Sequence, residues 1–318
     1  MKSRRTRSTA VLAALLLGAL GLTGCTPAQG ATEQGRLQVV TSFYPLEFVV
    51  GRVGGPDVQV TSLTRPGVEP HDLELTARDV ARMQDADLVV YLGGFQAAVD
   101  QAVEAHLGPR HVVDVAGAAR LDLVVGHDTE LGDEHLAGDD QAEEGALDPH
   151  FWLDPTRLAD VVTEVTSALA AADPAAATTF EGRSATLLQQ LQGLDDAFRQ
   201  GLADCASRDL VTSHSAFGYL AERYGFHQVG ITGLTPEAEP DPRSLARVAT
   251  YVRQHHVTTI YSERLASAAV ARTIAQETGA STAVLDPLEG LDDSSSGHDY
   301  LEVMRSNLET LRKGQSCR

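Results

Sequence analysis

Short apolar runs alternate with longer amphipathic stretches along the chain, and this alternation predicts its secondary structure. Apolar runs rich in β-branched side chains are typical of buried strands. In the first half of the chain such runs lie at residues 37–42, 58–63, 88–92 and 111–115. Stretches with helical spacing of apolar residues lie between them, at residues 44–53, 76–83 and 95–106. Strands separated by helices predict a parallel sheet with helical crossovers.

The same alternation returns in the second half of the chain. Strands are expected at residues 210–213, 227–231, 259–262 and 282–285. Helices are expected at residues 217–224, 242–255, 267–278 and 298–313. Residues 155–172 and 174–203 between the two halves are also expected to be helical. We therefore predict an α/β fold with two lobes, each a parallel-type sheet flanked by helices.

Residues 126–148 interrupt this pattern. The stretch contains many acidic side chains, two histidines, no Lys or Arg and almost no apolar spacing. Such a composition predicts a mobile surface loop.

The N-terminus has the pattern of an export signal. Four basic side chains precede a short apolar stretch, which ends in Leu-Thr-Gly-Cys at residues 22–25. This ending looks like a lipobox, which predicts that residues 1–24 are removed and that Cys25 is lipidated. A plain signal peptide with an incidental cysteine is the alternative. Residues 25–35 are small and polar, as expected of a flexible tether.

The charge of the chain is strongly acidic. The net charge is −19, and removal of residues 1–24 would leave 21 basic against 44 acidic side chains, a net charge of −23. Nothing in such a chain would neutralise phosphates, so nucleic acid is not an expected partner. A negative field raises the local concentration of cations, although acidity of this kind also serves solubility alone.

Two cysteines remain if Cys25 is lipidated. Export would place Cys205 and Cys317 in an oxidising compartment, where an even pair can form a disulfide. Two free thiols are the alternative.

Four residues in separate motifs are the candidate metal ligands: His71, His150, His214 and Asp286. Their surroundings read Arg-Pro-Gly-Val-Glu-Pro-His-Asp, Asp-Pro-His-Phe-Trp-Leu-Asp-Pro, Thr-Ser-His-Ser-Ala-Phe-Gly-Tyr and Leu-Asp-Pro-Leu-Glu-Gly. Three imidazoles and one carboxylate make a closed set for zinc or a similar divalent metal. A lone histidine is more often a structural residue, and that remains the alternative for each.

Several acidic side chains near these motifs are candidates to orient the imidazoles by hydrogen bonds. They are Glu69, Glu74, Asp148, Asp154, Glu239 and Glu263.

The order and wording of these motifs resemble the zinc/manganese group of solute-binding lipoproteins of bacterial ABC importers. The resemblance runs from about Val39 to Leu311. It implies that the metal lies between an N-terminal lobe (residues 36–173) and a C-terminal lobe (residues 204–318), joined by one long helix (residues 174–203). It also implies a metal-gathering role for the acidic loop, although a solvated linker fits that composition equally well.

The resemblance implies an extracytoplasmic binding protein and not an enzyme. The expected protein is a monomer that is lipid-anchored to the outer face of the cell membrane, captures a divalent metal and delivers it to an ABC permease and its ATPase. The third histidine, His214, favours Zn²⁺ over Mn²⁺, because manganese importers of this group tend to carry a carboxylate there.

Three alternatives stay open: a manganese-specific binding protein, a metal-binding adhesin of the same fold, and a secreted zinc hydrolase. Neither a His-Glu-x-x-His nor a Gly-x-Ser-x-Gly motif occurs, which disfavours the hydrolase.

Overall fold

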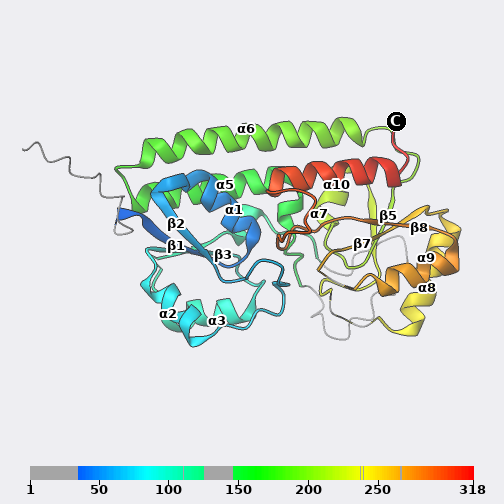
Figure 1. Cartoon of the computed structure of the whole chain (residues 1–318), viewed down its shortest axis with the longest axis horizontal. Coiled ribbons are helices and arrows are strands. Elements are labelled where there is room, and N and C mark those ends of the chain that lie inside the picture. Colours follow the sequence, from blue (N-terminus) through cyan, green and yellow to red (C-terminus); the bar gives the residue numbers. More distant parts are fainter. Residues whose placement is uncertain (1–34, 110, 125–145, 237, 239, 266) are drawn as a thin grey trace, which may run out of the picture. The chain divides into compact units, whose positions relative to one another are not determined.

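Figure 1 shows the computed structural model of the chain, which describes residues 35–109, 111–124, 146–236, 238, 240–265 and 267–318. The predicted signal peptide, Cys25, Glu239 and most of the predicted acidic loop therefore lie outside the described residues. Residues 36–318 form a single unit by their contacts, so the predicted lobe boundaries stay a prediction.

The first sheet contains four parallel strands: β1 (Leu37–Thr41), β2 (Val58–Ser62), β3 (Leu88–Tyr91) and β4 (Val112–Asp114). They lie in the order β2-β1-β3-β4. The connections contain helices α1 (Tyr44–Gly54), α2 (Ala77–Asp85) and α3 (Ala97–His106), and the short helix α4 (Ala116–Ala119) follows β4. Each strand falls on a predicted apolar run, and the two central strands, β1 and β3, are the most deeply buried.

The second sheet repeats this arrangement with β5 (Asp209–Thr212), β6 (His227–Gly230), β7 (Thr259–Ser262) and β8 (Ser281–Val284). They are parallel, in the order β6-β5-β7-β8. Its helices are α7 (Gly218–Tyr224), α8 (Pro242–Gln254), α9 (Ala269–Thr278) and α10 (Tyr300–Gly314). The prediction of two α/β lobes with parallel sheets is confirmed. The sequence shows no repeat, yet both sheets use the same strand order.

Two long helices lie between the sheets in the chain. Helix α5 (Pro155–Ala172) follows the 3₁₀ turn η3 (Phe151–Leu153), and helix α6 (Ala177–Gly201) follows a short turn. Asp173 makes that turn, since its Oδ1 accepts from the N–H groups of Ala175 and Ala176. For this reason α6 begins three residues later than predicted.

Helix α6 lies alongside α1 and α5 and continues along α10, as Figure 1 shows. Its buried face includes Leu187, Leu191, Leu194 and Phe198. The largest hydrophobic cluster includes residues from the first sheet, from these helices and from α7 and α10. Within the described residues, no helix is long and apolar enough to cross a bilayer.

Cys205 follows α6 and Cys317 follows α10, and the structure places them in a disulfide. The backbones of the same two segments also pair, because the Arg318 N–H donates to Asp204 O at 2.9 Å.

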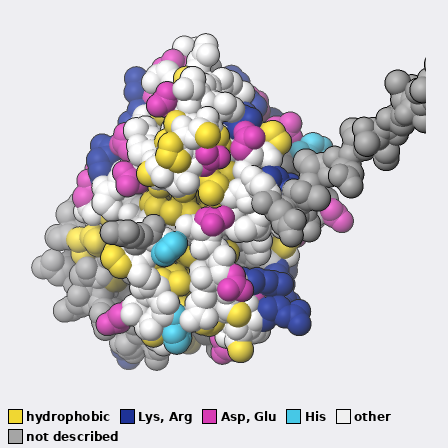
Figure 2. Space-filling model, turned by 90° about the vertical axis from the view of Figure 1, so that its left-hand side faces the viewer, with side chains coloured by type: hydrophobic (Ala, Val, Ile, Leu, Met, Phe, Trp, Pro, Cys, Tyr) yellow, Lys and Arg dark blue, Asp and Glu magenta, His cyan; other side chains and the backbone are white. Residues whose placement is uncertain are grey.

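Charged side chains are dispersed over the face of the molecule that Figure 2 shows. On the face in Figure 2, acidic side chains are scattered among basic ones and apolar ones instead of forming one patch. The net negative charge of the chain is therefore not gathered into one acidic surface on that side.

Candidate metal centre

Three imidazoles and one carboxylate converge in the interior. The donor atoms of His71, His150, His214 and Glu289 all lie within 4.8 Å of one another. Glu289 Oε1 lies 3.2 Å from Nε2 of His71, 3.1 Å from Nε2 of His150 and 3.2 Å from Nε2 of His214. Four donor atoms that face one another at such distances fit a single small cation.

The elements that carry these residues explain why the side chains meet. His71 lies on the loop after β2, His214 follows β5, and Glu289 lies on the loop after β8. His150 stands directly before η3. Ligands in open parallel sheets bind beyond the carboxyl ends of the strands, and three of the four residues lie there.

Carboxylates hold the outer nitrogens of two imidazoles. Asp148 Oδ1 lies 2.7 Å from Nδ1 of His150 and also accepts the backbone N–H of that residue. Glu263 Oε2 lies 2.5 Å from Nδ1 of His214, and its Oε1 accepts the backbone N–H of His214. With the Nδ1 proton donated outward, the Nε2 lone pair is directed at the centre of the site.

His71 is held differently. Its backbone N–H is 3.0 Å from both carboxylate oxygens of Glu69, and its Nε2 lies 3.8 Å from the nearer one. Burial raises the pKa of Glu69 to about 7. The edge of the His71 ring packs against Phe95, with ring centroids 4.8 Å apart.

The carboxylates shift the pKa values of the cluster. Burial alone would lower the pKa of His150 and His214, but Asp148, Glu263 and Glu289 outweigh it, so both pKa values are raised. The pKa of His71 is lowered, because burial outweighs its bond to Glu289. Burial would raise the pKa of Glu289, but its bonds to the three imidazoles keep it well below the usual range.

The centre is closed to solvent on most sides. The side chains of His150 and His214 are 0% exposed and that of Glu289 is 1% exposed, whereas that of His71 is 9% exposed. His71 is thus the least buried of the four side chains.

Asp286, the predicted fourth ligand, lies elsewhere, and Glu289 takes the expected position. Asp286 Oδ2 pairs with Arg264 Nε at 3.0 Å, and Oδ1 accepts from Leu288 N at 2.8 Å. Leu288 has a positive φ of 59°, which turns the chain between the two acids. The sequence motif was correctly located, but the carboxylate that faces the imidazoles belongs to Glu289, three residues after Asp286.

The other predicted carboxylates have four different outcomes. Glu69, Asp148 and Glu263 bond the site histidines as described above. Glu74 is exposed and bonds none of the three imidazoles within the described part of the chain. Asp154 caps α5 instead, accepting from Thr156 N at 2.8 Å. Glu239 lies outside the described residues.

Comparison with known proteins gives the family. Residues 39–314 match the family model described as zinc-uptake complex component A, periplasmic. The chain belongs to this family.

Several characterised relatives are similar over most of this chain. The zinc-binding protein AdcA of Streptococcus pyogenes is 39% identical over 297 residues, which is 90% of this chain and 58% of the relative. The zinc-binding lipoprotein AdcA of Streptococcus pneumoniae is 37% identical, over 93% of this chain and 59% of the relative. The high-affinity zinc uptake system protein ZnuA of Bacillus subtilis is 37% identical, over 94% of this chain and 93% of the relative. The chain thus spans about three-fifths of the AdcA proteins.

A solved structure agrees with the fold. The laminin binding protein Lmb of Streptococcus agalactiae, described as a bifunctional protein with adhesin and metal transporting activity, superposes with a TM-score of 0.75 at 30% identity. The superposition covers 88% of this chain and 99% of that protein.

Proposed function

We propose that the protein is an extracytoplasmic solute-binding protein that captures zinc and delivers it to an ABC import permease with its ATPase. The observation that supports this most directly is the set of three Nε2 atoms and Glu289 Oε1 that face one another. Imidazole suits zinc, whereas manganese prefers oxygen ligands. The zinc-related names of the relatives agree with this choice.

The ligand set also favours binding over catalysis. A catalytic zinc keeps one coordination position open for water. Here four protein groups would fill all four positions of a tetrahedral zinc ion. The closed surroundings of His150 and His214 would hold the ion away from solvent until it is released. We therefore expect the purified protein with zinc bound to show no metal-dependent hydrolysis.

Competitive titration tests the choice of metal. The metal-stripped protein would be titrated with zinc and manganese against one chromogenic chelator, and then with both ions together. Zinc should displace manganese at equal concentrations, because three of the four ligands are nitrogen donors. Manganese displacing zinc would overturn the zinc proposal and favour a manganese-specific binding protein.

We propose further that the protein is attached to the membrane through Cys25. The Leu-Thr-Gly-Cys sequence at residues 22–25 supports this, as does the description of one relative as a lipoprotein. In cells labelled with a fatty-acid probe, Cys25→Ala should abolish labelling. Cys205→Ser should leave the label in place, and label persisting in Cys25→Ala would refute the anchor.

Adhesion is a second candidate function, favoured by the superposition with Lmb. It predicts saturable binding of the purified protein to immobilised laminin. Lack of binding with both the zinc-loaded and the metal-stripped protein would remove this candidate and leave the proposed transport function untouched.

A further inference from the structure

The loop that carries Glu289 is held by one arginine side chain at several points. Arg264, which follows β7, reaches Asp286 through Nε at 3.0 Å and Asp292 through Nη1 at 2.7 Å. Its Nη2 donates to Gly290 O at 3.4 Å. One guanidinium thus contacts the residues three before, one after and three after Glu289. A planar fork of this kind fixes two carboxylates and a carbonyl in one arrangement.

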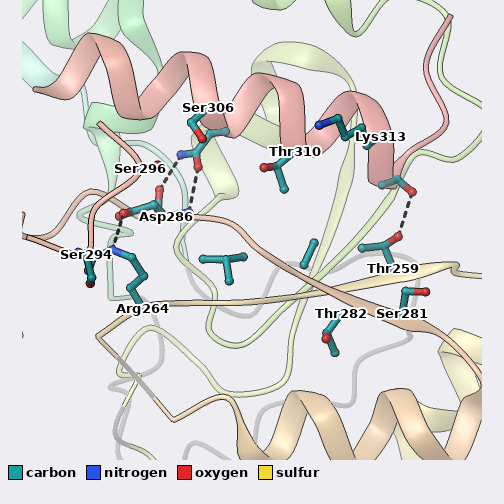
Figure 3. Close-up of a pocket in the computed structure, with 14 residues that line it drawn as sticks. Thr259, Arg264, Ser281, Thr282, Asp286, Ser294, Ser296, Ser306, Thr310 and Lys313 are labelled. Atoms are coloured by element: carbon teal, nitrogen blue, oxygen red, sulfur yellow. Dashed lines mark hydrogen bonds and ion pairs between the residues drawn. The ribbon is translucent and has the colours of Figure 1, made fainter. Parts of the chain in front are cut away.

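The base of the same loop is anchored to helix α10. Asn307 Oδ1 accepts from Asp286 N at 3.0 Å, and Asn307 Nδ2 donates to Asp286 O at 2.7 Å. Figure 3 shows Arg264 and Asp286 pointing toward each other. Both line a cavity of about 700 Å³, and half of its lining residues are Ser or Thr from β7, β8, α10 and the loop before α10. Arg264 therefore acts from the side of the loop that faces this cavity.

The residue before Arg264 holds another part of the site. Glu263 bonds both the Nδ1 and the backbone N–H of His214. Consecutive side chains after β7 thus hold two of the four groups that converge in the metal centre. A change in the backbone geometry just after β7 would displace both His214 and Glu289.

Charge gives Arg264 a further role. Asp286, Glu289 and Asp292 stand within seven residues of one another, and Arg264 pairs with the first and the last. Without the guanidinium, the loop would present adjacent unpaired carboxylates that repel one another. Glu289 would then lose both its backbone support and its alignment with the three Nε2 atoms.

We infer that Arg264 is a positioning residue for metal binding, which acts by holding the Glu289 carboxylate at the three imidazoles. This inference rests on the proposed function of the site. A purely structural role is the competing explanation, in which Arg264 stabilises the second lobe without acting through Glu289.

A double-mutant cycle separates the two explanations. Zinc affinity would be measured by chelator competition for the wild type, Arg264→Gln, Glu289→Gln and the double variant. Arg264→Gln should weaken zinc binding by about 10- to 100-fold, the range typical of groups that orient a ligand. In the Glu289→Gln background the same change should cost less than about threefold, because residues that act through one another are not additive.

Arg253→Gln is the matched control, since Arg253 lies on α8 in the same lobe with a half-exposed side chain and pairs only loosely with Glu277, at 3.6 Å. It should leave zinc affinity unchanged. If Arg264→Gln does not fold, Arg264→Lys replaces it in the cycle, because lysine keeps the charge and loses the fork. Its effect should be smaller but should also disappear in the Glu289→Gln background.

Cobalt substitution supplies a readout that a stability effect would not move. Co²⁺ in a tetrahedral site absorbs visible light much more strongly than Co²⁺ with additional water ligands. Arg264→Gln should shift the cobalt spectrum in the same direction as Glu289→Gln, whereas Arg253→Gln should not.

Equal losses of zinc affinity from Arg264→Gln in both backgrounds would overturn the positioning role. Unchanged affinity in Glu289→Gln alone would instead refute the proposed site.

Discussion

Leu288 is the residue whose backbone decides which acid faces the imidazoles. Its positive φ of 59° is unfavourable for a bulky side chain and costs on the order of 1–3 kcal/mol. The surroundings offset this cost, because the Leu288 side chain is fully buried and Pro287 O accepts from Trp152 Nε1 at 2.7 Å. The turn directs Asp286 to Arg264 and Glu289 to the histidines.

The first prediction compares the two acids directly. Glu289→Gln should weaken zinc binding by more than about 100-fold, above the range for groups that only orient ligands, because it removes the anionic donor. Asp286→Asn should weaken zinc binding by about tenfold at most, through its contact with Arg264. Chelator competition measures both affinities. A larger loss in Asp286→Asn than in Glu289→Gln would contradict the assignment of the fourth ligand.

The second prediction concerns pH. In the metal-free site the neighbouring carboxylates raise the pKa values of His150 and His214 and so favour their protonated forms, whereas burial lowers the pKa of His71 and favours its neutral form. Zinc should therefore displace protons from these two imidazoles, and its affinity should fall as pH decreases, by about 100-fold per pH unit where both are protonated. A third proton adds to the slope once pH falls below the pKa of His71.

Calorimetry in buffers of different ionisation enthalpy counts these protons directly, alongside affinity measured from pH 8 to pH 5.5. An affinity that stays constant over this interval would be incompatible with three imidazole ligands.

The sequence predicts a metal ligand correctly where the ligand stands in a local motif, and it fails where a backbone turn decides which of two acids faces the site. His71, His150 and His214 each stand in a motif that distinguishes them from the other histidines, and the structure brings all three together. The two acids after β8 lie in one short stretch, and nothing in their order reveals the positive φ between them. The longer Glu289 side chain and the glycine after it were the available clues.

At the scale of elements, local chemistry fixes where helices begin. Asp154 caps α5 with Pro155 in its first turn, and Thr76 forms a capping box with Asp79 at the start of α2. The predicted role of Asp154 near the metal was mistaken for this reason: its carboxylate is occupied by Thr156 at 2.8 Å and by Arg223 at 3.2 Å.

A buried carboxylate links α6 to α7. Asp195 on α6 is fully buried and accepts from Arg223 Nε at 2.6 Å and from Tyr224 OH at 3.0 Å, while Arg199 Nη2 lies 2.7 Å away. Burial would raise the pKa of Asp195, but the bonds from Arg223 outweigh burial and lower it below its ordinary value of 3.8. The ionised form therefore stabilises the fold.

The third prediction follows from that pKa. Asp195→Asn should reduce the free energy of unfolding at pH 7 by about 1–3 kcal/mol. Because the folded-state pKa is depressed, this stabilisation is complete above about pH 4 to 5, and it is lost as pH falls below the ordinary value toward the folded one. Urea unfolding between pH 7 and pH 3 measures it. The neighbouring exposed residue provides the control Asp196→Asn, which should behave as the wild type; a pH-independent loss in Asp195→Asn would argue against the ionic explanation.

At the scale of the whole molecule, sequence patterns do not determine which elements that are far apart in the chain pack against each other. Apolar periodicity predicted the strands and the long helix, but α6 contacts helices α1, α5 and α10, which come from both halves of the chain. The largest hydrophobic cluster includes residues of both sheets, although most buried residues of the second sheet pack with α8 and α9 in a cluster of their own. Such long-range contacts depend on side-chain shape across hundreds of residues.

The fourth prediction concerns the link between the ends of α6 and α10. Cys205 and Cys317 are separated by 112 residues, and cross-linking a loop of that length stabilises a fold by about 4–5 kcal/mol in the chain-entropy model. Cys205→Ser and Cys317→Ser should each lower the free energy of unfolding by that amount, and the double variant by no more, because either change breaks the same bond. Urea unfolding of the metal-free proteins measures all three.

Zinc affinity should stay within about twofold of the wild type in these serine variants, because neither cysteine bonds a residue of the metal centre. The backbone bond from Arg318 N to Asp204 O joins the same two segments without the sulfurs. If the serine variants unfold at the urea concentration of the wild type, that backbone pairing and the α6–α10 contact are sufficient to hold the C-terminus. If they lose zinc affinity along with stability, loss of the disulfide must also disturb the loop that carries Glu289. That loop is connected to α10 through Asn307.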